Sequence, residues 1–385
     1  MTRDLVRRLV HRLGSTVPAL PLAPSTRREV ILIRPDHLGD ALLTIPALRA
    51  LRAAEHRLYL TLLVGPWVRE VFTLRGLVDE VLVTPFPGFR RESTRNPFEP
   101  YRLLLRLADS LRRRGPMALV VLRDDHWWGA WLGALAGVPL RVGADHPAVR
   151  PFLTHPIPLR SQHVAARNLE LVTALLTVLG YSNDSRLLTP EAHPLTWPSD
   201  PGAARTVREA LERYGIAAPY IVVHPGSGAA AKCWPEERWA TLVDALATRG
   251  YQVLLTGSAS EHALLAKIVT ETRSVPRNLA GKLSLPELAE LLRQATLVIG
   301  TDTGPLHLAV AVGTPTVHLF GPTRPERFGP WGPRARHRVV HAPLRCPRCG
   351  DIGPDRACGA ACMMAIDVDD VLRIALELLE SRSTR

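Results

Sequence analysis

The sequence predicts an α/β protein with two doubly wound domains, and three observations support this. Short apolar runs of strand length alternate with segments that look helical, which is typical of parallel sheets covered on both faces by helices. The alternation stops at residues 181–202, which are rich in proline and polar residues, and then restarts. The length of 385 residues exceeds that of one typical domain.

The first half of the chain contains four expected strands and four expected helices. The strands are 29–34, 58–64, 78–83 and 118–122, and the helices are 41–53, 66–74, 100–114 and 127–136. A polar loop at 35–40 follows the first strand. We place the first domain at residues 29–190, after a basic N-terminal extension at 1–28.

The second half repeats this alternation, and we place the second domain at residues 191–385. Its expected strands are 220–224, 252–256, 297–300 and 316–320, and its expected helices are 236–249, 260–272, 284–294, 305–312 and about 368–380. Polar motifs follow the strands that end at 34, 224, 256 and 300. Ligands of doubly wound sheets bind beyond the carboxyl ends of the strands, so we expect a ligand cleft between two facing domains.

Composition and charge restrict the function classes. The net charge of +12 comes mostly from arginine, and it favours an anionic partner such as nucleic acid, an acidic membrane surface or a phosphorylated substrate. No run approaches the roughly 20 apolar residues of a membrane span, and basic residues interrupt the apolar N-terminus as they would not in a signal peptide. We expect a cytoplasmic monomer. No motif that reads nucleic acid stands out.

Two interpretations of the N-terminal extension remain open. Leu5, Val6, Leu9, Val10 and Leu13 recur at helical spacing with arginines between them. Such a helix could lie on the anionic inner face of a membrane. It could equally pack on its own domain.

The segment 297–309 predicts a phosphate-binding site. An apolar strand leads into a helix in which Pro305 suits the first turn and Asp302 or Thr303 suits the N-cap. The N–H groups and partial positive charge of a helix N-terminus attract phosphate. The alternative is an ordinary strand-to-helix connection with a capping aspartate.

Two further loops carry groups that suit a nucleotide. In the first, small residues from His224 to Gly228 are followed by Lys232, and backbone N–H groups with an ammonium are what a diphosphate needs. A glycine-rich turn with a solvated lysine would have the same sequence. In the second, Glu261 follows a strand and could bind a ribose, or it could serve as a first-turn helix acid. No G-x-G-x-x-G follows the first strand, and no Walker loop is present.

A third loop, at the start of the first domain, carries a candidate base. Asp40 follows Gly39 and opens a helix, so it is either a general base or an acid that complements the helix dipole. His37 lies nearby in the sequence, either as an acceptor contact or as a solvated loop histidine.

Four segments together resemble a known family. They are 31–34 with 38–48 (ILIR and LGDALLTIPAL), 224–235 (HPGSGAAAKCWP), 278–288 (NLAGKLSLPEL) and 300–307 (GTDTGPLH). In this order and spacing, over about residues 29–380, they resemble the signatures of glycosyltransferase family 9, the ADP-heptose:lipopolysaccharide heptosyltransferases. The resemblance implies a GT-B fold of two Rossmann-like domains. It also implies an acceptor site mainly on the first domain and a nucleotide-sugar site on the second.

The same resemblance implies roles for individual residues. Asp40 matches the family's catalytic base, Lys232 its phosphate-contacting lysine and Glu261 its ribose-binding acid. The residues that match those around the diphosphate and sugar are Asp302, Thr303, Gly304 and His307. The chain departs from the pattern before Lys232, where Ser227 is the one side-chain donor, and this leaves the identity of the sugar open.

The implied reaction is an inverting, metal-independent transfer of a sugar, a heptose by the resemblance, to a lipopolysaccharide-type or other glycan acceptor. A carboxylate takes the proton of the acceptor hydroxyl as it attacks the anomeric carbon. Lys232 and the helix N-terminus then stabilise the departing nucleoside diphosphate. By the resemblance, this chemistry needs no metal cofactor. The alternative is a non-catalytic nucleotide-sugar-binding protein on the same fold.

Four cysteines cluster before the last helix. Their spacing would allow a tetrahedral structural zinc site, and a similar cluster occurs in many members of the family. Free thiols and disulfides remain alternatives. The cysteines are Cys346, Cys349, Cys358 and Cys362.

Overall fold

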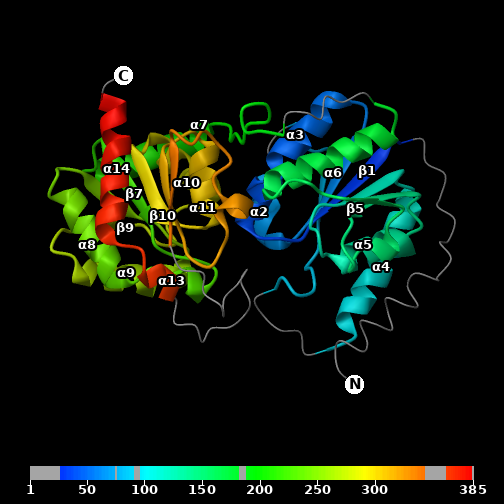
Figure 1. Cartoon of the computed structure of the whole chain (residues 1–385), viewed down its shortest axis with the longest axis horizontal. Helices are drawn as coiled ribbons and strands as arrows, with labels where there is room; N and C mark the ends of the chain where they lie inside the picture. The colour runs from blue at the N-terminus through cyan, green and yellow to red at the C-terminus, as the bar shows by residue number, and fades with distance from the viewer. Residues whose placement is uncertain (1–26, 74–75, 91–95, 182–187, 343–360, 384–385) are drawn as a thin grey trace. The chain divides into compact units, whose positions relative to one another are not determined.

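The computed structural model describes residues 27–73, 76–90, 96–181, 188–342 and 361–383. The chain divides into two compact units, Met1–Thr189 and Pro190–Arg385. Each unit contains one six-stranded sheet with helices on both faces (Figure 1). The predicted α/β class is confirmed.

The sheet of the first unit is parallel throughout, in the order β3-β2-β1-β4-β5-β6. Its strands are β1 Glu29–Arg34, β2 Tyr59–Val64, β3 Glu80–Val83, β4 Ala118–Val121, β5 Leu140–Ala144 and β6 His155–Ile157. Every residue of β1 is buried. Its apolar interior suits a central strand covered on both faces.

Helices of the first unit pack in two pairs, α3 with α6 and α4 with α5. The helices are α2 Leu38–Leu42, α3 Ile45–Ala54, α4 Glu99–Arg114, α5 Trp127–Leu135 and α6 Val164–Val178, with 3-10 turns η1 Pro66–Thr73 and η2 Arg150–Phe152.

The helix predicted at 41–53 is instead two helices, α2 and α3, separated at residues 43–44. Pro46 explains the break, because it has no N–H to donate to the carbonyl of Leu42 and its ring crowds that carbonyl. The first of the two helices also begins earlier than predicted, at Leu38, which places Asp40 in its first turn.

The second sheet has the same topology as the first. Its order is β12-β11-β10-β7-β8-β9, again with all pairs parallel. Its strands are β7 Tyr220–His224, β8 Gln252–Leu255, β9 Arg277–Asn278, β10 Leu297–Thr301, β11 Thr316–Phe320 and β12 His337–His341. In both sheets the strand order therefore reverses between the first and fourth strands of the unit, β1 and β4 or β7 and β10.

Helices of the second unit again form two groups: α8 packs against α9 and α14, and α10 packs against α7 and α11. The helices are α7 Pro201–Arg213, α8 Glu236–Ala247, α9 His262–Glu271, α10 Leu285–Gln294, α11 Gly304–Ala311, α12 Pro325–Phe328, α13 Ala361–Met364 and α14 Val368–Ser383, with 3-10 turns η3 Ala230–Lys232 and η4 Ala259–Glu261. No helix in the described part of the chain is long and apolar enough to cross a membrane.

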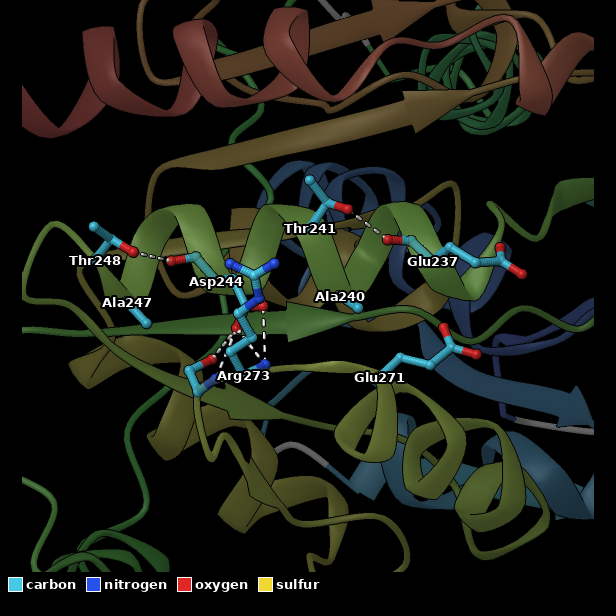
Figure 2. A pocket seen from close by; sticks show the side chains of 9 residues that line it. Glu237, Ala240, Thr241, Asp244, Ala247, Thr248, Glu271 and Arg273 are labelled. Carbon is cyan, nitrogen blue, oxygen red and sulfur yellow. Dashed lines mark hydrogen bonds between the residues drawn. The ribbon is translucent and has the colours of Figure 1, made fainter.

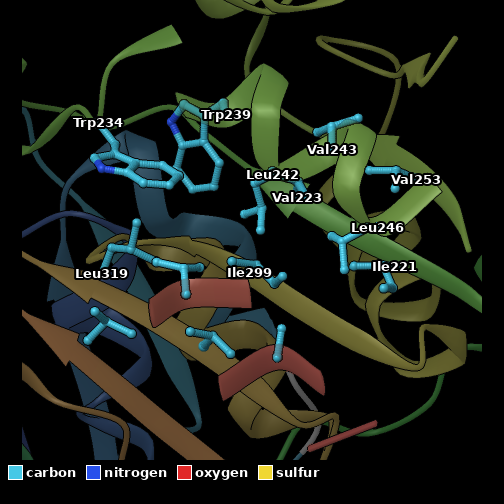
Figure 3. Packing of buried hydrophobic residues seen from close by; sticks show 14 of the residues in the cluster. Ile221, Val223, Trp234, Trp239, Leu242, Val243, Leu246, Val253, Ile299 and Leu319 are labelled. Atoms are coloured by element: carbon cyan, nitrogen blue, oxygen red, sulfur yellow. The ribbon is translucent and has the colours of Figure 1, made fainter. Parts of the chain in front are cut away.

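Two tryptophans anchor the core of the second unit (Figure 3). Trp234 and Trp239 are both buried, and their rings meet edge to face with centroids 4.8 Å apart. The indole N–H of Trp234 donates to the carbonyl of Ile366 at 3.1 Å, and Arg238 donates to the same oxygen. The indole nitrogen of Trp239 is buried and has no hydrogen-bond partner among the described residues.

This difference predicts unequal effects of one substitution. We expect Trp234→Phe to lower the free energy of unfolding by about 1 kcal/mol more than Trp239→Phe, because only the first change removes a hydrogen bond. Urea denaturation of the two variants measures the difference. An equal loss in both, or a larger loss for Trp239→Phe, would contradict the assignment.

Candidate functional site

The candidate functional residues of each unit lie at the carboxyl ends of the strands, around the point where the strand order reverses. Side chains there are the usual ligand contacts of doubly wound sheets. In the first unit this point lies beyond β1 and β4, and in the second it lies beyond β7 and β10.

Arg34, the last residue of β1, organises the group in the first unit. Its side chain is 3% exposed. Nη1 donates to the carbonyl of Leu122, just after β4, at 2.6 Å and to Oδ1 of Asn168, on α6, at 3.3 Å. Nε lies 3.0 Å from a carboxylate oxygen of Asp36, and Nη2 donates to Oδ1 of Asp40 at 2.7 Å. One guanidinium thus joins two strands, a helix and two carboxylates.

Asp36 is as deeply buried as Arg34 and pairs with a second arginine, Arg123. Burial alone would raise the pKa of the Asp36 carboxyl. The positive charges of Arg34 and Arg123 outweigh burial and hold this pKa below its usual value. Asp36 is therefore an anion shared by two cations.

The predicted residues Asp40 and His37 both lie at the start of α2. Asp40 is in the first turn of the helix, with its side chain 29% exposed. His37 is at the N-cap position and is exposed, and its ring centroid lies 5.2 Å from that of Trp67. The indole N–H of Trp67 donates to the carbonyl of Asp36 at 2.8 Å. The carboxylate of Asp40 is therefore held by Arg34 and still reaches solvent.

His126, the N-cap residue of α5 after β4, is a buried histidine. Its ring meets Phe86 and Phe89 edge on, and neither ring nitrogen has a hydrogen-bond partner within the described ranges. Burial lowers the pKa of His126 to about 4, against the opposing charge of Asp36. The imidazole is neutral at pH 7.

In the second unit, Lys232 and Asp302 form a direct ion pair. Nζ of Lys232 lies 2.7 Å from Oδ2 of Asp302 and 3.3 Å from its backbone carbonyl oxygen. His307 lies on the other side of the carboxylate, with Nε2 3.8 Å from Oδ1. Burial would raise the pKa of Asp302, but the neighbouring His307 and the charge of Lys232 lower it far below its usual value.

The N-terminus of α11 lies directly after this ion pair. Thr303 is the N-cap residue, but its hydroxyl donates to the carbonyl of Thr301 at 3.2 Å, and no side chain caps the helix. Gly304 and Pro305 form the first turn. Thr301 donates to the carbonyl of Gly226 at 2.9 Å, which connects the end of β10 to the loop after β7. The predicted phosphate-binding site therefore has backbone N–H groups at the start of α11 that the side chain of Thr303 does not satisfy.

Glu261 has two environments, one for each carboxylate oxygen. Oε2 accepts from the backbone N–H and the hydroxyl of Ser258, as part of a capping box at η4. Oε1 lies against Gly226, where a Cβ would be only 2.0 Å away. Ser227, next in this loop, is half-buried, and its hydroxyl accepts from the N–H of Ala229 at 3.4 Å. Glu261 therefore has the position of a first-turn helix acid, and its role in binding a ribose stays a prediction.

The structure thus brings together most of the predicted residues of the second unit. Lys232, Asp302 and His307 are in contact, and Thr303 and Gly304 adjoin them in the chain. Glu261 and Ser227 adjoin the loop that Thr301 anchors. Sequence patterns did not predict the ion pair between Lys232 and Asp302, because the two residues are 70 positions apart.

The predicted zinc site stays a prediction. Cys346, Cys349 and Cys358 lie outside the described residues, and Cys362 is buried in the core beside Met363. Within the ranges that the structure describes, no three His, Cys, Asp or Glu side chains are placed to hold a metal ion.

A surface pocket of about 820 Å³ lies apart from these groups, along α8 and the end of α9 (Figure 2). Its polar residues serve local structure: the carboxylate of Asp244 accepts from the backbone N–H groups of Arg273 and Ser274. None of the predicted site residues lines it.

Comparison with known proteins gives one consistent result. A profile of the family described as "Glycosyltransferase family 9 (heptosyltransferase)" matches residues 104–350, well over half of the chain. Lipopolysaccharide heptosyltransferase 3 of Escherichia coli is 32% identical over 221 residues, which is 55% of this chain. That match spans 62% of the relative's own length.

Two solved structures share the fold. A family 9 glycosyltransferase of Veillonella parvula has a TM-score of 0.75 at 22% identity, covering 93% of this chain and 99% of that one. The E. coli heptosyltransferase WaaC with ADP has a TM-score of 0.64 at 22% identity, covering 91% and 99%. The predicted GT-B fold class is confirmed, whereas the predicted ligand cleft between the domains stays a prediction.

The burial of His126 predicts a pH-dependent stability. The folded pKa of about 4 lies below the value of about 6.5 for an unfolded histidine. The unfolded state therefore binds the proton first, and stability present above pH 6.5 is lost as the pH falls. From pH 7 to pH 5 we expect this histidine to reduce the free energy of unfolding by about 2 kcal/mol.

Urea denaturation at the two pH values tests this with His126→Phe, which keeps an aromatic ring among Phe86 and Phe89. We expect the variant to lose about 2 kcal/mol less than the unmodified chain. The exposed His56 provides the control, since His56→Phe should leave the pH dependence unchanged. An unchanged pH dependence in His126→Phe would contradict the assignment.

Proposed function

This chain belongs to glycosyltransferase family 9, and from that membership we propose that it transfers a heptose from an ADP-linked donor to a lipopolysaccharide acceptor. The observation that carries the proposal is the Lys232–Asp302 ion pair, which lies immediately before the uncapped N-terminus of α11. An ammonium beside free helix N–H groups suits the diphosphate of a nucleotide-sugar.

In this proposal the second unit binds the donor. Lys232 and the N–H groups at Thr303 and Gly304 contact the diphosphate. Asp302 keeps the ammonium in place, and His307 supports that carboxylate. Glu261 accepts from the ribose hydroxyls through Oε1, while Oε2 continues to cap η4. Ser227, in the loop after β7, supplies a further hydroxyl group.

The first unit supplies the base and the acceptor contacts. Asp40 takes the proton of the acceptor hydroxyl as that oxygen attacks the anomeric carbon, so the configuration at this carbon inverts. Its partly exposed carboxylate is accessible to a substrate, and His37 contacts the acceptor. Negative charge that gathers on the departing ADP is stabilised by Lys232 and the α11 N-terminus. The residues in these roles provide charge stabilisation without a metal cofactor.

The proposed setting is the cytoplasm, on the inner face of a membrane that carries the acceptor, with the chain acting as a monomer. The net charge of +12 favours binding to a glycan or lipid-linked acceptor, because lipid surfaces and lipopolysaccharide cores are anionic. The proposal does not call for nucleic acid as a partner.

The base assignment predicts a large loss of turnover in Asp40→Asn. Asparagine keeps an oxygen that can accept from Arg34, but it cannot take a proton at neutral pH. We expect kcat to fall by about 10²- to 10⁴-fold with unchanged affinity for ADP. Heptose transfer from ADP-heptose to truncated lipopolysaccharide and calorimetry with ADP measure the two quantities.

Asp145→Asn is the matched control, because Asp145 lies in an ion pair with Arg150 elsewhere on the first unit, and it should retain full activity. Turnover that survives in Asp40→Asn would exclude Asp40 as the base. Binding of ADP-heptose without turnover in the unmodified chain would favour the alternative of a non-catalytic binding protein.

The packing of Gly226 predicts a contrast between two neighbouring glycines. A methyl group at Gly226 would meet Oε1 of Glu261 at 2.0 Å, whereas one at Gly228 would meet nothing within 4 Å. We expect Gly226→Ala to displace Glu261 and weaken ADP binding by about tenfold or more, the cost of a hydrogen bond to a charged group. Gly228→Ala should bind ADP normally. Equal affinities of the two variants in calorimetry would remove Glu261 from the nucleotide site.

A further inference from the structure

We infer that Arg34 is the positioning residue for the catalytic carboxylate: its buried guanidinium orients Asp40 and keeps it anionic for proton abstraction. This inference rests on the proposed function, in which Asp40 is the base. It adds a residue that does not itself contact the substrates.

The guanidinium of Arg34 is held in the fold by contacts at its nitrogen atoms. All three of its nitrogens have a role: Nη1 is bonded to the Leu122 carbonyl and to Asn168, Nε faces Asp36, and Nη2 donates to Asp40 at 2.7 Å. The first two sets of contacts fix the plane of the guanidinium in the fold. Nη2 is therefore held in one position, and it fixes Oδ1 of Asp40 relative to the sheet.

The contrast in burial supports a role beyond packing. The side chain of Arg34 is 3% exposed, whereas that of Asp40 is 29% exposed. An ion pair between a rigid buried cation and an accessible anion keeps the anion oriented while substrate can still reach it. A carboxylate held in this way loses less entropy when it aligns with a nucleophile.

The position of the Arg34 charge also favours Asp40 as an anion. Arg34 lies against both Asp36 and Asp40, whereas Asp36 also pairs with Arg123, which in turn pairs with Asp125. The guanidinium lies 2.7 Å from Asp40, and an opposite charge at this distance stabilises the ionised form of a carboxyl group.

Arginine suits this position better than lysine would. A lysine ammonium carries the same charge but lacks the planar fork that makes contacts in three directions. Arg34→Lys should therefore keep the electrostatic effect and lose the fixed orientation. Arg34→Met should lose both while keeping much of the side-chain volume.

The closing experiment measures kcat, the KM for acceptor, the Kd for ADP and the melting temperature of both variants. ADP-heptose and truncated lipopolysaccharide serve as substrates. We expect kcat to fall about tenfold in Arg34→Lys and about 100-fold in Arg34→Met, with an unchanged Kd for ADP because the donor contacts lie in the second unit. A purely structural role would not produce a selective loss of kcat with partial rescue by lysine.

Arg114→Met is the matched control for lost stability. Arg114 also makes ion-pair contacts, with the buried Glu29 at 2.5 Å and with the partly exposed Glu80 at 2.5 Å, but at the opposite end of β1. We expect this variant to melt at a lower temperature and to keep the kcat of the unmodified chain.

Two results would overturn the inference. One is a loss of kcat in Arg34→Met no larger than that in Arg114→Met at a similar melting temperature. The other, which decides if Arg34→Met does not fold, is an unchanged kcat in Arg34→Lys. Failure of the proposed function gives a different result, because the unmodified chain would then show no turnover or Asp40→Asn would keep it.

Discussion

Hydrogen bonds between loops and strand ends hold the chain together at the reversal point of each sheet. In the first unit, Arg34 at the end of β1 donates to the carbonyl of Leu122 after β4. In the second, Thr301 at the end of β10 donates to the carbonyl of Gly226 after β7. Connections leave these strands toward opposite faces of the sheet, so their carboxyl ends are where polar side chains remain accessible. The positions of Asp40, Lys232 and Asp302 all depend on this arrangement.

How far the fold could be predicted depended on how each strand is stabilised. The central strands β1 and β10 are continuous apolar runs that are fully buried, and such runs are recognisable in a sequence. The edge strands β6 and β9 have three and two residues, and β9 is Arg277–Asn278. Their conformation comes from hydrogen bonds with a neighbouring strand, which is distant information that a local pattern does not contain. Neither was predicted. The strands β5 and β12 were not predicted either, because charged or polar side chains interrupt their apolar residues.

The site was predictable to a similar extent. Asp40, Lys232 and the start of α11 follow strands and have local signals that a sequence shows, and the family resemblance gave them roles. The partners of these groups were not predictable. Arg34 contacts Asn168, and Lys232 contacts Asp302, and both contacts join residues far apart in the chain. The neutral state of His126 was not predictable either, because it depends on burial that only the packed aromatic side chains create.

The two oxygens of Glu261 have an evolutionary consequence. Because Oε2 caps a helical turn, selection for thermal stability alone would retain a glutamate here in a descendant that had lost all affinity for nucleotide. Gly226 would be retained with it, because a Cβ at this position would lie 2.0 Å from Oε1 of the same glutamate. Among diverging copies of this chain, a conserved pair of Glu261 and Gly226 is therefore a marker of the capped turn and not of a retained nucleotide site.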